Sequence, residues 1–392
     1  MKEGWEYKKL GEVCDIVGGG TPDKKNKNFY GGNIPWATVR DMNVESVKHT
    51  EYSITKEGLD KSSSHIIHEG EVIIATRVGL GKVCLLEQDT AINQDLKGIV
   101  PKKNDINRKY LFYWFKFEAK NIISNGVGAT VKGVKLSFIN NLSFPCISPS
   151  EQQRIVSYLD AAFAKIDAVA KNAEDALNEA KALFQSALAK MMEPKEGWEE
   201  RTLLEIGKTQ TGTTPSKSNS AFYGDYMPFI RPSEINYDGL GNLNYNSEIK
   251  LSKEGSESGR VFKTGSILMV CIGATISKVG YNEQDVSCNQ QINVITPYDG
   301  FNYKFIYYAM TAPKFKAKVI NEGTSSQATL PIINKRKWEQ LTLAFPPIDE
   351  QINIVDKLEI MNQKICNMSS NLTRTLTECA ALKQSILRKT FE

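Results

Sequence analysis

Two long stretches with helical spacing of apolar residues constrain the fold more than any other feature of this chain. The first runs from Ser148 to Met192, is rich in Ala, Leu, Lys, Glu and Gln, and has no Gly and no Pro beyond Pro149. Its apolar residues alternate between steps of four and three: Ile155, Leu159, Ala162, Ile166, Val169, Ala173, Ala176, Ala180, Leu183 and Ala187. This repeat predicts a long helix with a coiled-coil seam, widened by Phe163, Leu177, Phe184 and Met191.

The same pattern returns from Ile348 to the C-terminus. The second stripe consists of Ile354, Leu358, Met361, Ile365, Met368, Leu372, Thr375, Cys379, Leu382 and Ile386. Each stretch starts with Pro followed by an acidic residue, and we expect Ser150 and Asp349 to cap the two helices. At about 1.5 Å per residue, each helix spans roughly 60 to 65 Å.

The order of the segments predicts how the two helices pair. One globular segment precedes the first helix, and a second segment connects the two helices. If the helices pair, the second must return antiparallel to the first, because a compact segment joins the end of one to the start of the other. The alternative is two separate amphipathic helices, each packed on its own globular segment.

The two globular segments are copies of each other. At a constant offset, Gly4-Trp5-Glu6 aligns with Gly197-Trp198-Glu199, and Thr21-Pro22 aligns with Thr214-Pro215. Further matches are Phe29-Tyr30-Gly31 with Phe222-Tyr223-Gly224, Asn93-Gln94 with Asn289-Gln290, and Leu142-Ser143-Phe144-Pro145 with Leu343-Ala344-Phe345-Pro346. The chain is therefore a duplicated unit of one globular segment and one helix.

Inside each copy, local patterns predict a mixed arrangement of strands and helices. Val72–Thr76 and Ile267–Ile272 are apolar, β-branched runs bounded by Gly, as in buried strands. Arg108–Ala119 and Tyr303–Ala317 have helical aromatic spacing. The fold class is α+β, with two duplicated mixed α/β domains separated by two long antiparallel coiled-coil helices. We divide the chain at 1–147, 148–193, 194–346 and 347–392.

Composition and charge narrow the functional classes. The chain has no apolar run long enough to cross a bilayer and no apolar N-terminal leader, so we expect no membrane association. Its seven cysteines are scattered without a Cys-x-x-Cys pair, which favours reduced thiols in a cytoplasmic protein. The net charge of +4 comes from mildly basic globular segments, which permits a polyanionic partner.

No catalytic or nucleotide-binding motif is duplicated. The loops Gly18–Pro22 and Gly79–Val83 lack the Gly-Lys-Ser/Thr that a phosphate-binding loop requires, although turns of this kind can present backbone N–H groups to DNA phosphates. His65 and His68 correspond to Arg260 and Lys263, which cannot serve as metal ligands. A metal site in only one copy of a duplicated unit is not expected. We therefore interpret the two histidines as surface or strand-edge residues and expect no cofactor, metal or catalytic residue in this chain.

The remaining polar residues fit DNA recognition. Lys and Arg neutralise phosphates, whereas Arg, Asn and Gln can form paired hydrogen bonds with base edges. Basic clusters lie at Lys102, Lys103, Arg108 and Lys109, at Lys314, Lys316 and Lys318, and at Lys335, Arg336 and Lys337. The candidate DNA-binding residues are Lys24, Lys25, Lys27, Arg40, Arg77, Lys82 and Gln94 in the first copy and Lys217, Arg231, Ser277, Lys278 and Gln290 in the second.

Several motifs in order resemble the specificity (S) subunits of type I restriction–modification systems. Gly19-Gly20-Thr21-Pro22 and Phe29-Tyr30-Gly31 are similar to the start of their target recognition domains. Gly70-Glu71-Val72-Ile73-Ile74 and Thr130-Val131-Lys132-Gly133-Val134 resemble later landmarks, and Glu151-Gln152-Gln153-Arg154 resembles the entry to a spacer helix. The second copy departs at Phe229, which replaces Trp36, at Ser325-Ser326-Gln327-Ala328-Thr329, and after Glu350-Gln351.

This resemblance implies a function for each of the four segments. Residues 1–147 and 194–346 would be target recognition domains, each reading one half of a bipartite sequence in double-stranded DNA. The spacer helices 148–193 (central conserved region) and 347–392 (C-terminal conserved region) would set the gap and dock two methyltransferase (M) subunits. Candidate seam residues are Ile155, Leu159, Ile166, Leu183, Leu358, Ile365, Leu372 and Ile386.

The resemblance also implies that the chain is a non-catalytic subunit. S-adenosylmethionine and ATP would belong to the methyltransferase subunits and the restriction/motor (R) subunits. Three alternatives stay open: a coiled-coil adaptor that binds no DNA, the specificity subunit of a related methyltransferase-only system, and an enzyme in its own right.

Overall fold

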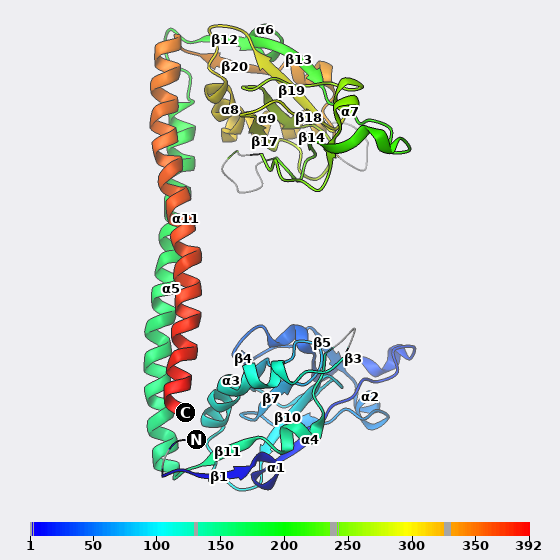
Figure 1. The fold of residues 1–392 in the computed structure, drawn as a ribbon, viewed down its shortest axis with the longest axis vertical. Helices are drawn as coiled ribbons and strands as arrows, with labels where there is room; N and C mark the ends of the chain where they lie inside the picture. Colours follow the sequence, from blue (N-terminus) through cyan, green and yellow to red (C-terminus); the bar gives the residue numbers. More distant parts are fainter. Residues whose placement is uncertain (1, 3, 129–131, 236–240, 242, 325–330) are drawn as a thin grey trace. The chain divides into compact units, whose positions relative to one another are not determined.

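The computed structural model is described here for all residues of 1–392 except 1, 3, 129–131, 236–240, 242 and 325–330. The chain divides into two compact units (Figure 1). Unit 1 contains Met1–Asn172 and Arg374–Glu392, and unit 2 contains Ala173–Thr373. The two long helices, α5 (Pro149–Met191) and α11 (Ile348–Phe391), contribute residues to both units.

Unit 1 combines three sheets with short helices. A five-stranded sheet has the order β2-β10-β7-β8-β4, a four-stranded sheet has the order β5-β3-β9-β6, and β1 pairs with β11. The strands are β1 (Glu6–Lys9), β2 (Cys14–Gly18), β3 (Tyr30–Ala37), β4 (Ser46–Val47), β5 (Tyr52–Ile54), β6 (Ile66–Ile67), β7 (Val72–Ala75), β8 (Val83–Leu86), β9 (Thr90–Ile92), β10 (Leu96–Pro101) and β11 (Ser143–Cys146). The helices are α1 (Leu10–Val13), η1 (Lys27–Phe29), η2 (Val39–Met42), α2 (Lys56–Asp60), α3 (Arg108–Ser124) and α4 (Leu136–Asn140).

Unit 2 repeats this plan. Its sheets have the orders β13-β19-β16-β17, β15-β14-β18 and β12-β20. The strands are β12 (Glu199–Thr202), β13 (Gly207–Thr211), β14 (Tyr223–Ile230), β15 (Lys250–Leu251), β16 (Ile267–Val270), β17 (Val279–Tyr281), β18 (Ser287–Cys288), β19 (Ile292–Pro297) and β20 (Thr342–Phe345). The helices are α6 (Leu203–Ile206), η3 (Ser220–Phe222), α7 (Lys253–Glu257), α8 (Tyr303–Thr311), α9 (Pro313–Thr324) and α10 (Lys335–Glu339).

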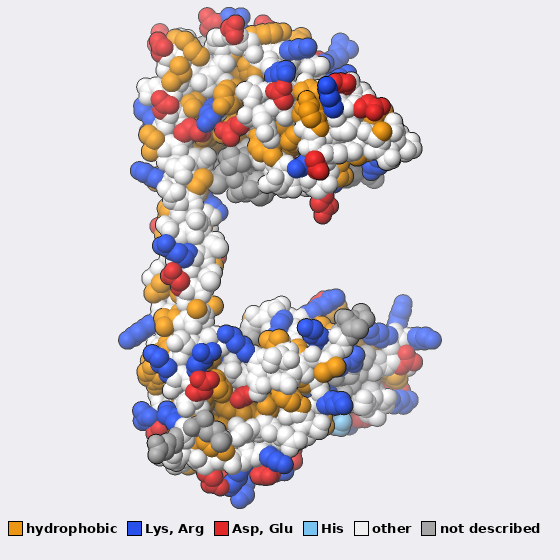
Figure 2. Space-filling view, in the orientation of Figure 1, with side chains coloured by type: hydrophobic (Ala, Val, Ile, Leu, Met, Phe, Trp, Pro, Cys, Tyr) orange, Lys and Arg blue, Asp and Glu red, His pale blue; other side chains and the backbone are white. Residues whose placement is uncertain are grey.

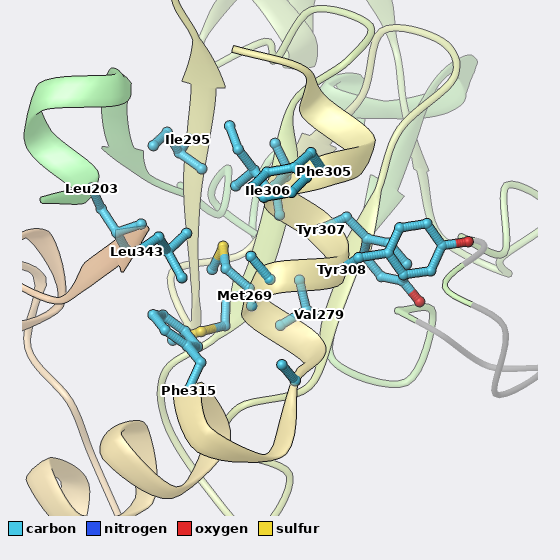
Figure 3. Close-up of a cluster of buried hydrophobic side chains, with 14 of the residues drawn as sticks. Leu203, Met269, Val279, Ile295, Phe305, Ile306, Tyr307, Tyr308, Phe315 and Leu343 are labelled. Carbon is cyan, nitrogen blue, oxygen red and sulfur yellow. The ribbon is translucent and has the colours of Figure 1, made fainter. Parts of the chain in front are cut away.

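The central strand of each unit is buried on both faces. In β7, Val72 and Ile74 join the cluster beneath α3, whereas Ile73 and Ala75 join a second cluster on the opposite face. This alternation follows from the two-residue period of a strand, and it explains why the run is apolar throughout. In β16, Met269 packs in one buried cluster with side chains of α8. Figure 3 shows it with Phe305, Ile306, Tyr307 and Tyr308.

One predicted helix of unit 2 is two helices. The prediction for Tyr303–Ala317 was wrong at Ala312, which ends α8 in an extended conformation, with φ −61° and ψ 141°. Pro313 follows directly and begins α9. Proline has no N–H and disfavours the helical conformation of the residue before it, so the break was visible in the sequence.

The long helices match the predicted stretches, but the capping residues do not. In α5 the cap is Ser148, whose Oγ accepts a hydrogen bond from the Glu151 N–H at 3.3 Å, and Ser150 lies inside the helix. In α11 the first bonds instead go to the Pro347 carbonyl, which accepts from the N–H of Glu350 at 2.9 Å. Asp349 likewise lies inside its helix. Pro cannot donate, so each helix starts at or directly after the proline.

The predicted seam is correct along most of α11 but displaced in α5. Val169 and Leu183 are 55% and 65% exposed, whereas Phe163 and Leu177 are 5% exposed. An α-helix drifts by about 20° per heptad against a strict seven-residue repeat, so the larger side chain one position later takes the buried face. Of the candidate seam residues, Ile155, Leu159, Ile166, Leu358 and Ile365 are buried, Leu372 and Ile386 are partly buried, and Leu183 is exposed.

Contacts within each unit establish antiparallel packing of α5 and α11. In unit 1, the Cys379 thiol lies 3.8 Å from the Ile166 carbonyl, and Lys383 forms an ion pair with Asp167 at 2.6 Å. Leu382 is exposed at this level, and the Lys383 ammonium lies over the Phe163 ring instead. In unit 2, Leu188 shares a cluster with Ile354, Val355 and Leu358. Among the described residues, no helix is long and apolar enough to cross a membrane.

Candidate nucleic-acid interface

Both units hold a glycine loop against the end of a strand. A Cβ placed on Gly19 would lie 2.1 Å from the Asn93 carbonyl, and a Cβ on Gly212 would lie 2.1 Å from the Asn289 carbonyl. Only glycine fits such an approach. The Gly20 N–H donates to the Ile92 carbonyl at 3.0 Å, so this N–H is not available to a phosphate. The prediction that the loop presents it to DNA was wrong at this residue, because the same approach that requires Gly19 closes the bond.

The candidate residues Gln94 and Gln290 lie at equivalent places beside this loop. The Thr21 hydroxyl is hydrogen-bonded to Gln94 Oε1, and the Thr214 hydroxyl is hydrogen-bonded to Gln290 Oε1. Both glutamines are exposed at the surface. A side-chain amide held from one side in this way keeps donor and acceptor atoms for a base edge.

The two histidines occupy places that permanent cations fill in unit 2. His65 Nδ1 lies 2.8 Å from the Gly18 carbonyl, and the Arg260 guanidinium donates to the equivalent carbonyl of Thr211. His68 pairs with Asp89 at 3.1 Å, as Lys263 pairs with Asp285 at 2.6 Å. All four side chains are exposed. We call the polar surface beside the glycine loop the rim; it includes His65 and Gln94 in unit 1 and Arg260 and Gln290 in unit 2.

A charged group in unit 1 has neutral counterparts in unit 2. Arg77 forms an ion pair with Asp95 at 3.6 Å, and Lys97 Nζ donates to the Gln94 carbonyl at 3.2 Å. Burial lowers the pKa of Lys97 from its ordinary value. Ladder register aligns Ile73 and Gly98 with Leu268 and Val294. The group Arg77, Asp95 and Lys97 therefore corresponds to Ile272, Gln291 and Asn293.

Lys97 is a residue that the sequence analysis missed. It lies between buried Leu96 and buried Gly98 in β10, so the two-residue period of a strand places its side chain on the other face of the sheet from that of Leu96. This alternation is visible in the sequence, but using it requires knowing that β10 is a strand beside β7.

The hairpin that follows the central strand carries the next candidates. Lys82 and Lys278 are equivalent, because each directly precedes the strand that pairs in the same register with the central strand. Lys82 Nζ donates to Asn43 Oδ1 at 2.6 Å, and Lys278 Nζ donates to the Pro232 carbonyl at 3.3 Å. Ser277 is 8% exposed with φ 71°. Its equivalent is Gly81, at φ 87°, and this backbone conformation forms the tight hairpin. The placement of Ser277 therefore does not suit a base contact.

The candidates Arg40 and Arg231 do not occupy equivalent positions in the two units. Arg40 is exposed and forms an ion pair with Glu51 at 3.1 Å. Arg231 replaces Thr38 and binds buried Glu234 through its Nη2 at 2.7 Å and its Nε at 3.2 Å. A guanidinium held by a buried carboxylate has fewer donors for a base edge than the exposed Arg40.

The remaining lysines lie in exposed loops. Lys24, Lys25, Lys27 and Lys217 are all exposed, and the Lys25 N–H donates to Asp23 Oδ1 at 3.0 Å. Figure 2 shows Lys and Arg side chains scattered over the visible face of unit 1, not gathered in one continuous patch. Arg108 and Lys109 of the first basic cluster begin α3 and pair with Glu71 and Asp160.

Two further landmarks fall outside the described residues. These are Thr130 and Val131 of the first copy and Ser325–Thr329 of the second. The chain that follows each landmark is hydrogen-bonded to the residue after the central strand. The Val134 N–H donates to the Thr76 carbonyl, and the Ile333 N–H donates to the Cys271 carbonyl, each at 2.9 Å.

Among the described residues, potential metal ligands are dispersed and several cysteines are buried. No group of three or more His, Cys, Asp or Glu side chains within them is arranged to hold a metal ion. Burial raises the pKa of the Cys14, Cys84 and Cys271 thiols to about 12, so these cysteines carry protonated, unreactive thiols at neutral pH.

Comparison with known proteins gives the family. The type I restriction modification DNA specificity domain matches residues 2–179 and 195–377. The chain is 27% identical over 251 residues to the type I restriction enzyme MjaIX specificity subunit of Methanocaldococcus jannaschii, which covers 59% of this chain and 58% of that protein. It is 33% identical over 168 residues to the EcoR124I/EcoR124II specificity subunit of Escherichia coli, covering 41% of each. The matched regions thus span about half the length of these relatives.

Solved structures share the fold. One comes from work on complex assembly and conformational transition of the type I R-M system, with a TM-score of 0.76, 21% identity, and coverage of 100% of this chain and 98% of that chain. The HsdS subunit of Thermoanaerobacter tengcongensis gives a TM-score of 0.55 and 20% identity, with coverage of 100% and 97%. Since the family match extends over both copies, the chain belongs to the type I restriction modification DNA specificity family.

Proposed function

We propose that this chain is the sequence-reading subunit of a type I restriction–modification complex. Each unit would read one half of a bipartite target in double-stranded DNA, and α5 and α11 would set the gap between the halves. The observation that carries the proposal is the duplicated rim: Gln94 and Gln290 occupy equivalent places, whereas the neighbouring Arg77, Asp95 and Lys97 are exchanged for Ile272, Gln291 and Asn293. One scaffold with different rim chemistry suits reading two different sequences.

The chemistry of the complex would belong to partner subunits. Two methyltransferase subunits would dock on the long helices and bring S-adenosylmethionine, and motor subunits would bring ATP. This chain would contribute no catalytic residue and would act in the cytoplasm with chromosomal DNA. Exposed apolar side chains on the long helices, among them Leu183 and Ile360, support a docking role because they leave apolar area for a partner to cover.

Selection of DNA by the assembled complex tests this function. The full chain is purified with its methyltransferase subunits and incubated with a random-sequence DNA pool, and the bound fraction is sequenced. Enrichment of one motif with two conserved halves and a fixed unread gap is expected. Enrichment of no motif would favour the adaptor, and methyl transfer by the chain alone would favour an enzyme.

A further inference from the structure

The start of each long helix is fastened to its own unit by a buried glutamine. In unit 1, Gln152 Oε1 accepts a hydrogen bond from the Asn107 N–H at 2.7 Å. Its Nε2 donates to the carbonyls of Asp105 at 2.8 Å and Ile147 at 2.9 Å. Gln152 is only 2% exposed, and Asn107 is the residue that caps α3. The amide thus joins the beginning of α3 to the beginning of α5.

Unit 2 contains the same fastening. Gln351 Oε1 accepts from the N–H of Asn302, the cap of α8, at 3.0 Å. Gln351 Nε2 donates to the Pro346 carbonyl at 2.9 Å, and the side chain is again 2% exposed. The Glu-Gln pair that opens both helical stretches in the sequence therefore has a structural reason, because the glutamine is the link between the helix and its unit.

A second link lies two helical turns further along each helix. In unit 1, Asp160 accepts a hydrogen bond from the Tyr113 hydroxyl at 2.5 Å and one from Lys109 Nζ at 2.7 Å. In unit 2, Glu359 accepts from the Tyr308 hydroxyl and from Lys304 Nζ, the latter at 2.6 Å. We call each set of carboxylate, tyrosine and lysine a carboxylate clamp.

The physical chemistry of the two clamps is matched. Burial, and then the hydrogen bond to the carboxylate, raise the pKa of Tyr113 and Tyr308, so both hydroxyls remain donors at physiological pH. Burial is the largest single influence and lowers the pKa of Lys304, but the hydrogen bond to Glu359 and the charges of Glu359, Tyr281 and Tyr303 together outweigh it, and the pKa is raised. Each carboxylate therefore holds two donors in charge-assisted bonds, which are shorter and stronger than neutral ones.

The tyrosine ring connects each clamp to the apolar core. Tyr113 packs edge-on against Phe163 of α5, with ring centroids 5.5 Å apart, and Tyr308 packs against Phe184 at 6.2 Å. Figure 3 shows Tyr308 on α8 among the other core side chains of unit 2. In unit 1 both contacts are to α5, so a movement of the unit on α5 would have to break a charged bond and separate packed rings at once. In unit 2 the carboxylate belongs to α11 and the Phe184 ring belongs to α5, so Tyr308 contacts both long helices.

Buried Leu159 and Leu358 already pack each helix against its unit, but apolar contacts are non-directional. The glutamine and the clamp add two directional contacts roughly 12 Å apart along the helix axis, because two turns of helix separate them. Two such contacts define the angle between helix and unit more narrowly than one. The substitution of Glu359 for Asp160 keeps the contact although the side chain is one methylene longer.

We propose that Asp160 and Glu359 are positioning residues. Through the carboxylate clamps they would hold each recognition unit at a fixed tilt on its own helix, and so limit the range of gap lengths that the complex accepts. The inference rests on the proposed function, since a gap has meaning only for a bipartite target. We expect the clamps to make no contact with DNA. Removing one should therefore widen the range of accepted gaps and leave the bases read in each half unchanged.

The test uses Asp160→Asn, Glu359→Gln, Tyr113→Phe and Tyr308→Phe in the full chain assembled with its methyltransferase subunits. The probe is a DNA library that contains the two half-sites selected by the unmodified complex, separated by gaps of several lengths, with the half-site bases partly randomised. Gaps one base pair shorter or longer should be recovered about tenfold more often by the variants, the scale expected for loss of a charge-assisted bond.

The matched control is Glu151→Gln. Glu151 forms an equally short ion pair with Arg154, at 2.6 Å, but both partners of this pair lie on the first turns of α5 itself, so the pair does not join the helix to α3 as the Asp160 clamp does. This variant should keep the narrow gap distribution, and thermal melting is followed for all five proteins.

Each result decides between the possibilities. Wider gap tolerance with unchanged half-site bases supports the clamps as positioning residues. An unchanged gap distribution in all four variants overturns the inference, including the case in which they melt at lower temperature, because the clamps would then act only on stability. If the unmodified complex selects no bipartite motif, the proposed function fails and the clamp role fails with it.

Discussion

Arg77 is an exposed cation whose surroundings differ between the two units. Its guanidinium lies 3.6 Å from Asp95 on the rim of unit 1, and the equivalent ladder position in unit 2 is Ile272. Ile272 offers no hydrogen bond. If the rim reads bases, this position should discriminate between the two half-sites more than the shared glutamines Gln94 and Gln290 do.

Arg77→Ala should therefore weaken DNA binding through one half-site only. A lost bidentate base contact costs about 1–3 kcal/mol and relaxes preference at one position. Binding of the assembled complex to duplexes with single base changes in either half measures this. Lys24→Ala is the control, since an exposed phosphate contact should weaken binding to all sequences and reduce the salt dependence by about one charge. Unchanged affinity and preference for Arg77→Ala would remove this residue from the interface.

At the scale of elements, large side chains decide which stripe of a helix is buried. In α5, Leu177 is 5% exposed and Leu183 is 65% exposed, although both lie on the widened apolar stripe of the sequence. Phe184 packs against Tyr308 at this level and takes the buried place next to Leu183. The two leucines are on the same helix in the same unit, so they form a matched pair for measuring what the seam contributes.

Leu177→Ala should lower the free energy of unfolding by about 2–5 kcal/mol, because a buried leucine loses its contacts and leaves a cavity. Leu183→Ala should change it by no more than about 0.5 kcal/mol, as expected for an exposed position. Urea or thermal unfolding of the two variants and the unmodified chain measures both. Equal destabilisation would contradict the displaced seam.

The sequence was sufficient for those elements whose signal is local or duplicated. The spacing of apolar residues predicts the two long helices, and the apolar runs predict β7 and β16. None of these four predictions required tertiary information. The seam at Leu183, the correspondence of Arg231 with Thr38, and the placement of Lys97 each depend on which neighbours compete for a face or a ladder position. The break at Pro313 and the glutamines Gln152 and Gln351 were visible as local or repeated signals, although their structural roles were not inferred.

At the scale of the whole molecule, the proposed function depends on the continuity of α5 and α11. Both helices run without a break through residues that belong to the two different units, at Pro149–Met191 and Ile348–Phe391. Pairing of Ile166 with Cys379 and the antiparallel direction imply that Ala173 and Leu372 lie at a similar level, since one helix ascends as the other descends. A change of length made at both positions would therefore alter the two helices together.

Insertion of one four-residue block, such as Ala-Glu-Ala-Leu, after Ala173 and another after Leu372 should shift the preferred gap. Each block lengthens its helix by about 6 Å, which corresponds to about two base pairs of DNA at roughly 3.4 Å per pair. Selection from the library of variable gaps should recover the same half-site bases at a gap about two base pairs longer. The control carries four extra residues in the exposed turn at Asp299 and Gly300, which holds no candidate DNA-binding residue and should leave the gap unchanged. A doubly extended chain that still selects the original gap, with melting that shows an intact fold, would mean that the long helices do not set the spacing, and the gap would then have to be fixed by the partner subunits.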